Sequence, residues 1–163
     1  MAKSLVVYYS LTGNTRLVAE EIANSIKADL LEIKPVNEIN PKGSLKFVWG
    51  GYQATMKKKP DLKPYEINPE EYDIIFIGTP VWAWTLTPPI RSFIGKHDLS
   101  NKKLALFMSA AGEGGKAMQK YKEVVSKSNI LGDIMFQDPL LKSTEAAKHK
   151  AAKWAKEMID KSK

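Results

Sequence analysis

Residues 9–26, with the sequence YSLTGNTRLVAEEIANSI, place small polar side chains between an apolar run and an amphipathic run. Four of these side chains can offer a hydroxyl or amide hydrogen, and one glycine among them allows a tight turn. Free N–H groups at a helix start, together with the helix dipole, favour an anion. The segment therefore predicts a phosphate-binding loop, with a plain helix cap as the competing interpretation. The loop residues are Ser10, Thr12, Gly13, Asn14 and Thr15.

Two common nucleotide-binding patterns are absent from this loop. It contains no lysine, unlike the Walker loop, and Gly13 is its only glycine, so the G-x-G-x-x-G pattern is missing. A loop that binds phosphate through neutral donors suits a phosphate monoester on which no chemistry takes place.

A second candidate segment is TPVWAWTLTPP, residues 79–89, which follows an apolar run. Trp82 and Trp84 are one residue apart and would point to the same side of an extended loop. Offset aromatic stacking contributes about 0.5–1.5 kcal/mol beyond burial, so the pair predicts a wall for a planar ligand. The alternative interpretation is that both tryptophans close the end of the core.

A third candidate segment is SAAGEGGKA, residues 109–117, where Ser109 and three glycines follow another apolar run. Such a backbone can approach a ligand closely and offer N–H donors, although a plain strand-to-helix turn fits the same pattern. Together the three segments describe a phosphate site, an aromatic wall and a row of backbone donors. A flat heteroaromatic mononucleotide requires these three features.

The elements that must position these segments alternate between strand and helix. Apolar, β-branched and aromatic runs predict strands, and apolar residues at helical spacing predict helices. The predicted strands cover 3–10, 28–35, 72–80 and 102–110, with a fifth around Ile134–Phe136 within 130–141. The predicted helices cover 14–27, 88–97, 114–128 and 143–163. We expect residues 36–70 to be irregular, with a short helix within 44–59 that is interrupted or ended near Gly50 and Gly51. Ser143 is the expected cap of the last helix.

Continuous apolar strands need cover on both faces, which the intervening helices supply. The sequence therefore predicts an α/β protein: a three-layer α/β/α sandwich that forms one domain over residues 1–163. In open parallel sheets, ligands bind beyond the carboxyl ends of the strands. We thus expect the loops after the first, third and fourth strands to meet.

Composition narrows the function classes. The chain has 163 residues, no cysteine and a formal net charge of +7. The absence of cysteine excludes disulfides, iron–sulfur clusters and a thiol nucleophile. The lysines are scattered rather than gathered in a stripe, which argues against nucleic-acid binding, and no apolar run approaches the length of a membrane span. We expect a cytoplasmic protein. His97 and His149 are expected at the surface, and we predict no catalytic side chain and no metal site.

The strand–SLTGNT–helix start resembles the phosphate loop of the flavodoxin family, and YDIIFIGTPVWAW and LFMSAAGEGG resemble its two flavin-flanking loops. The resemblance covers nearly the whole chain. It implies a five-stranded parallel sheet of order 2-1-3-4-5, bound flavin mononucleotide (FMN) and electron transfer.

The resemblance also implies a role for individual residues. The phosphate would be held by Ser10, Thr12, Gly13, Asn14 and Thr15, with the backbone N–H of Leu11 as a further donor. The flavin ring would be flanked by Pro80, Val81, Trp82, Ala83 and Trp84. Its pyrimidine edge would contact Ser109, Ala110, Ala111 and Gly112.

Two functions follow from this resemblance. The first is a flavodoxin-like carrier, a monomer or weak dimer, that passes electrons between redox partner proteins. Because the chain is basic, those partners are expected to be acidic. The alternative is an FMN-dependent NAD(P)H:quinone-type oxidoreductase, for which FVWGGYQATMKKKP (residues 47–60) would supply aromatic and cationic side chains near the site. A binding module that has lost its flavin is disfavoured by the intact phosphate loop.

Overall fold

The computed structural model describes residues 2–40, 42–43 and 45–163, with the side chain of residue 47 also outside the description. Met1, Pro41 and Ser44 belong to the predicted domain, the last two to its irregular segment, and lie outside the described residues. Five parallel strands form one sheet in the order β2-β1-β3-β4-β5. The predicted fold class and strand order are therefore confirmed. The strands are β1 (Ser4–Tyr8), β2 (Asp29–Glu32), β3 (Ile74–Pro80), β4 (Lys103–Ala110) and β5 (Asn129–Gln137).

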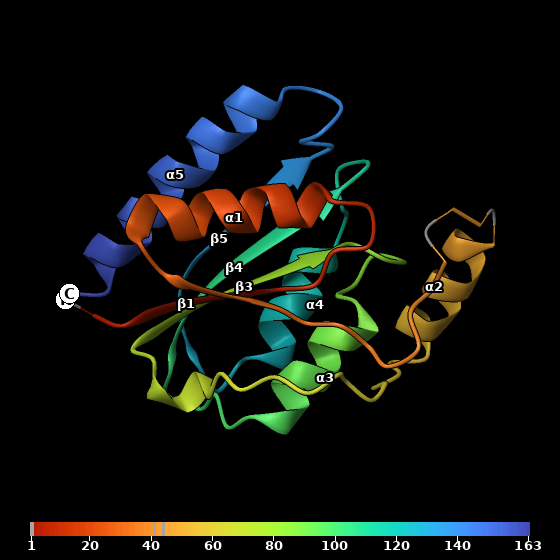
Figure 1. Ribbon diagram of the computed structural model, residues 1–163, viewed down its shortest axis with the longest axis horizontal. Helices are drawn as coiled ribbons and strands as arrows, with labels where there is room; N and C mark the ends of the chain where they lie inside the picture. The colour runs from red at the N-terminus through yellow and green to blue at the C-terminus, as the bar shows by residue number, and fades with distance from the viewer. Residues whose placement is uncertain (1, 41, 44) are drawn as a thin grey trace.

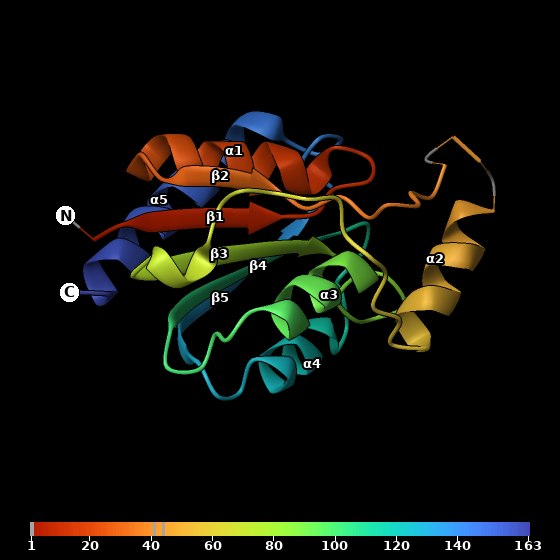
Figure 2. The same cartoon turned by 60° about the horizontal axis from the view of Figure 1, so that its bottom comes forward.

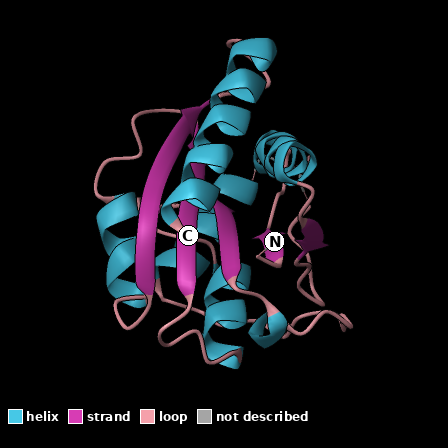
Figure 3. Cartoon of the chain, turned by 90° about the vertical axis from the view of Figure 1, so that its left-hand side faces the viewer, coloured by secondary structure: helices cyan, strands magenta, loops and turns pink. Residues whose placement is uncertain are grey.

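The helices cover both faces of the sheet, as Figures 1 and 3 show. One face carries the first and last helices, and the other carries the third and fourth (Figure 2). The chain places its described helices at α1 (Asn14–Ile26), α2 (Lys46–Thr55), α3 (Pro88–Lys96), α4 (Ala117–Val124) and α5 (Thr144–Lys161).

Strand side chains alternate between two apolar cores. In β1, Val6 and Tyr8 pack on the side of α1 and α5, whereas Leu5 and Val7 pack on the side of α3 and α4. All four are buried because both faces of the strand are covered.

A close approach in the middle of the sheet depends on one glycine. Gly78 of β3 lies between Tyr8 of β1 and Phe107 of β4 in the strand register. A Cβ atom added to Gly78 would lie 2.1 Å from Cε2 and Cζ of the Phe107 ring. The aromatic ring thus occupies the space that a side chain at position 78 would need.

Two predicted helix boundaries were wrong. The helix expected to be interrupted or ended near Gly50 and Gly51 instead continues through both, to Thr55. The helix expected from residue 114 begins at Ala117, because Gly114 and Gly115 adopt left-handed φ angles of 73° and 53°.

The expected cap position of the last helix is confirmed, but the side-chain bond expected of a cap is not made. Ser143 occupies the cap position, but its side chain makes no capping hydrogen bond. The neighbouring Thr144 hydroxyl instead donates to the Pro139 carbonyl at 3.2 Å. The helix start is therefore fixed to the loop that follows β5.

Different parts of the chain lie at the two ends of the strands. The first and last described residues lie near the ends where the strands begin, and α2 stands on the side where the strands end (Figure 2). Among the described helices, none has the length and apolar content that a membrane span requires.

Candidate ligand-binding site

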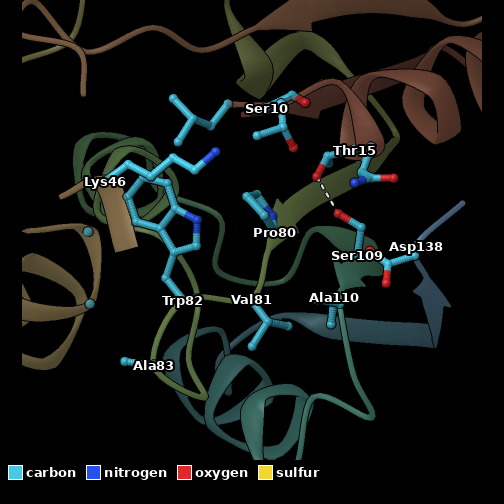
Figure 4. A pocket seen from close by; sticks show the side chains of 16 residues that line it. Ser10, Thr15, Lys46, Pro80, Val81, Trp82, Ala83, Ser109, Ala110 and Asp138 are labelled. Atoms are coloured by element: carbon cyan, nitrogen blue, oxygen red, sulfur yellow. Dashed lines mark hydrogen bonds between the residues drawn. The ribbon is translucent and has the colours of Figure 1, made fainter. Parts of the chain in front are cut away.

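The loops after β1, β3 and β4 meet around one cavity of about 460 Å³ at the carboxyl edge of the sheet (Figure 4). The cavity lies beside β1 and β3, where the strand order reverses, which is the usual ligand position in such sheets. The volume lies within the roughly 300–1,000 Å³ that is usual for small-molecule sites. Most of the predicted site residues line it: Ser10, Leu11, Thr12, Asn14, Thr15, Pro80, Val81, Trp82, Ala83, Ser109, Ala110 and Ala111.

The first loop divides its polar groups between structure and cavity. The Ser10 Oγ accepts a hydrogen bond from the Gly13 N–H at 3.1 Å, and the Asn14 Oδ1 accepts one from the Leu140 N–H at 3.0 Å. Gly13 takes a φ of 102°, which favours glycine, and does not line the cavity. Thr12 lines the cavity, and its hydroxyl has no hydrogen-bond partner among the described residues. Thr12 is therefore the side chain of this loop most available to a ligand.

A hydroxyl pair joins the first loop to β4. The Thr15 Oγ1 and the Ser109 Oγ lie 2.6 Å apart, and the dashed line in Figure 4 marks the hydrogen bond between them. Both residues are buried. The two hydroxyls carry two hydrogens, and the bond between them uses one. One hydrogen therefore remains to be donated to a ligand.

The second loop is anchored at both ends by one threonine. The Thr79 Oγ1 accepts a hydrogen bond from the Thr87 N–H at 3.0 Å and lies 2.9 Å from the Thr87 hydroxyl. It also lies 2.9 Å from the Pro80 carbonyl, to which it can donate. These contacts hold the base of the loop closed.

Between those ends the chain makes a two-residue hairpin rather than the extended loop that would place both tryptophans on one side. Trp82 and Thr85 exchange two backbone hydrogen bonds of 3.1 Å. The two residues between them, Ala83 and Trp84, have φ angles of 47° and 55°. Two successive positive φ angles are the mark of the type I′ turn that fits a twisted hairpin. The expectation that Trp82 and Trp84 share a side was wrong.

The hairpin separates the two tryptophans. Trp82 lines the cavity, with its ring edge-on to Tyr9 at a centroid distance of 5.6 Å and an angle of 87°. A Cβ added to Gly50 would lie 3.2 Å from the Trp82 ring, so α2 lies directly against it. Trp84 is 67% exposed and does not line the cavity. Only Trp82 is therefore placed to contact a ligand there.

The buried phenol behind Trp82 is held by a carboxylate. The Tyr9 hydroxyl donates to the Glu38 Oε1 at 2.8 Å. Burial, and then the negative charge of Glu38, raise the pKa of Tyr9 above its ordinary value. Tyr9 thus stays protonated and acts as a fixed support for the indole of Trp82.

The third loop is fixed by backbone bonds to its neighbours. The Val81 N–H donates to the Ser109 carbonyl at 2.8 Å, and the Asp138 N–H donates to the Ala110 carbonyl at 2.9 Å. Gly112 does not line the cavity, and a Cβ there would meet nothing within 4 Å.

Several lining residues were not predicted from the sequence. They are Lys46, Gly50, Gly51 and Asp138. Asp138 directly follows β5, so the rule that ligands bind at the carboxyl ends of strands would have found it. The glycine pair gave a signal too, because two glycines inside a helix often mark a close approach. Among the described lining residues, Lys46 and Asp138 are the charged ones.

One expected surface residue is partly enclosed. His97 is half-buried, and its Nε2 lies 2.6 Å from the Tyr65 hydroxyl. Burial, followed by the positive charge of Lys96, lowers the pKa of His97. His97 does not line the cavity, and His149 is exposed as expected.

Comparisons with known proteins agree with this geometry. The sequence model of a family described as flavodoxin matches residues 3–158. The chain is 31% identical over 150 residues to the flavodoxin-like domain-containing protein BilS of Clostridioides difficile (strain CD3), covering 88% of this chain and 70% of that protein.

Solved structures show the same arrangement of elements. The crystal structure of a flavoprotein in complex with FMN from Lactobacillus acidophilus NCFM superposes with a TM-score of 0.73 and 26% identity, covering 88% of this chain and 99% of that one. Oxidised flavodoxin 2 from Bacillus cereus has a TM-score of 0.60 and 21% identity, covering 98% of this chain and 99% of that one, and supports the fold alone.

Proposed function

This chain belongs to the flavodoxin family, and from that premise we propose that it binds FMN in the 460 Å³ cavity and transfers electrons between redox partners. The observation that carries the proposal is the meeting of the β1, β3 and β4 loops on this one cavity. A polar loop at the start of α1 lies at one side of it, and Trp82 lies at another.

The residues present fit FMN at both of its ends. The Thr12 hydroxyl and the backbone N–H groups at the start of α1 suit a phosphate dianion, which the helix dipole also favours. Trp82 and the apolar side chains of Val81 and Pro80 suit the flat flavin ring.

Bound FMN supplies the redox chemistry, because it can accept and release one or two electrons. The chain itself binds and orients the cofactor. The Thr15–Ser109 pair and the Thr79 network fix the loops before binding, so little ordering is needed when the cofactor enters. Trp82 excludes water from its side of the cavity.

Reconstitution tests the binding proposal directly. Purified protein, stripped of any flavin, should take up one FMN per chain and quench the fluorescence of both the flavin and Trp82. Riboflavin, which lacks the phosphate, should bind more weakly. A chain that binds neither compound while remaining folded by circular dichroism contradicts the proposal.

The two tryptophans of the hairpin give a matched pair of variants. Trp82→Ala should weaken FMN binding at least about tenfold, because stacking and burial of the ring are both lost, and should shift the flavin absorption bands. Trp84→Ala removes an exposed ring outside the cavity and should leave both unchanged. Titration followed by absorbance measures both variants. Equal effects at the two positions would show that the hairpin, rather than the Trp82 ring, governs binding.

Net charge suggests the class of redox partner. The chain carries +7, so we propose that its protein partners are acidic and that encounter is steered electrostatically. Electron transfer from the reduced protein to an acidic haem protein should therefore slow as NaCl is added, since salt screens attraction between exposed charges. Transfer to a basic haem protein should accelerate under the same conditions. Stopped-flow rates that do not change with NaCl concentration for either acceptor contradict electrostatic steering.

A second function is favoured by the position of α2. Lys46, Gly50 and Gly51 of this helix border the cavity, so a small substrate that meets the cofactor would also meet α2. This arrangement suits reduction of a small molecule, such as a quinone, with NAD(P)H as donor. Anaerobic addition of NAD(P)H separates the two functions, because only the enzyme would bleach its flavin without a partner protein.

A further inference from the structure

A second cavity lies on the other side of the Trp82–Thr85 hairpin. It has a volume of about 390 Å³ and lies between the end of α2, the hairpin, α3 and α4. Ala83 lines both this cavity and the one assigned to FMN, so the hairpin is their shared wall. Its lining residues are Ala54, Thr55, Lys57, Ala83, Thr85, Arg91, Lys120, Glu123 and Val124.

The unusual residue in this cavity is Arg91. It is 8% exposed, yet no carboxylate lies within ion-pair distance of its guanidinium among the described residues. Its Nη2 donates to the Thr85 Oγ1 at 3.2 Å, and its buried Nε has no hydrogen-bond partner there. Burial lowers the pKa of Arg91 from its ordinary value.

A buried, unpaired cation is costly, and proteins normally pair such a group. An arginine fork matches carboxylates and phosphates, whose two oxygens can accept parallel hydrogen bonds. Lys57 and Lys120, which line the same cavity, add two further positive charges. The cavity therefore has the charge and the donors of an anion site.

One lining residue opposes an anion. Glu123 is exposed, lies beyond ion-pair distance from Arg91, and can accept a hydrogen bond from the Gln119 amide at 3.4 Å. The lining carries three positive residues, Arg91, Lys57 and Lys120, and one negative residue, Glu123, so positive charge still predominates.

We propose that Arg91, with Lys57, Lys120 and the Thr85 hydroxyl, forms a second binding site that takes an oxyanion, the phosphate or carboxylate group of a small molecule. The site is distinct from the FMN cavity, whose phosphate loop lies at the start of α1. An anion bound there holds the hairpin from behind through Thr85 and the guanidinium.

Nuclear magnetic resonance can follow this site with an internal control, because the chain has two arginines. Inorganic phosphate and sodium acetate are titrated separately into FMN-saturated protein at constant ionic strength, with chloride as the reference anion. The Arg91 Nε–Hε signal should shift and saturate, with a dissociation constant on the order of 1 mM. The Arg16 Nε–Hε signal should not shift, since Arg16 is ion-paired with Glu32. Saturation by phosphate alone identifies a phosphate ester, and saturation by acetate identifies a carboxylate.

Variants at Lys120 and Glu123, which are both exposed, keep the test independent of folding at Arg91. Lys120→Ala should weaken the anion about two- to fivefold, whereas Lys148→Ala on the far helix α5 should not change binding. Glu123→Gln should tighten it, because one repulsive charge is removed. Arg91→Lys should weaken it about tenfold or more, because the fork is lost.

Three outcomes overturn the proposal. The first is an Arg91 signal that does not saturate with either anion. The second is a shift of Arg16 and Arg91 by the same amount, which reports ionic strength alone. The third is a Glu123→Gln variant with weaker anion binding and lower thermal stability, which would make Glu123 the partner of Arg91.

Discussion

Gly78→Ala is expected to cost about 3 kcal/mol or more of folding stability. The added methyl would lie 2.1 Å from the Phe107 ring, far inside van der Waals contact, at a buried position between two strands. Neither strand can move away, because β3 is hydrogen-bonded to β1 and β4. Overpacking of this kind usually costs about 1–3 kcal/mol and occasionally more, a large share of the roughly 5–15 kcal/mol that holds a domain together. Urea denaturation of the flavin-free protein measures the loss.

The same substitution at an open site provides the control. Gly112→Ala adds a methyl that meets nothing within 4 Å and should change stability by no more than about 0.5 kcal/mol. Phe107→Leu should recover part of the Gly78→Ala cost in the double variant, since the clashing ring atoms are gone. A Gly78→Ala protein as stable as the parent would show that β3 and β4 adjust freely.

Thr12→Val is expected to lower FMN affinity at least tenfold while leaving riboflavin affinity nearly unchanged. Thr12 lines the cavity, and its hydroxyl has no hydrogen-bond partner in the part of the chain that the structure describes. Valine keeps the shape of threonine while removing the donor. Hydrogen bonds to charged groups contribute about 1.5–3 kcal/mol, which corresponds to a factor of roughly ten to more than a hundred. Fluorescence titration with both flavins gives the ratio that isolates the phosphate.

Two neighbouring positions should behave differently. Asn14→Ala also removes the hydrogen bond that holds Leu140, so it should weaken FMN and riboflavin together through the loop after β5. Ser10→Ala removes the acceptor of the Gly13 N–H and should lower stability as well as binding. If Thr12→Val reduces both affinities equally, the threonine supports the loop and does not recognise phosphate.

The fold was predictable because its signals are local and strong. Continuous apolar strands and helical spacing predicted the three layers, and strand order followed from the family resemblance. The site was predictable to the extent that polar residues lie at or just beyond the carboxyl ends of strands, as Thr12 does after β1 and Ser109 does near the end of β4. The sequence could not show which hydroxyls bind each other, since Thr15 and Ser109 are 94 residues apart.

The hairpin at residues 82–85 shows why the rest was missed. Left-handed φ angles are normally marked by glycine or asparagine, and here Ala83 and Trp84 adopt them. The turn is imposed by the Thr79–Thr87 bonds at its base and the paired bonds of Trp82 and Thr85, which are tertiary constraints. Residue propensity therefore gave no sign of this turn or of the exposed position of Trp84.

The separation of the cavity walls along the chain has a consequence for biosynthesis. The walls come from the loop that follows β1, from α2, from the loop that follows β3, from the end of β4 and from Asp138 after β5, so the cavity forms only once most of the chain has been made and the parallel strands have paired. Pairing over such sequence distances is slow. Under the proposed function, FMN would bind only the folded chain, because the cavity exists only there. Cofactor insertion then follows translation, and FMN at a hundred times its dissociation constant adds about 2.7 kcal/mol to native stability. We therefore expect a newly made chain without FMN to be cleaved by protease faster than the same chain with FMN bound.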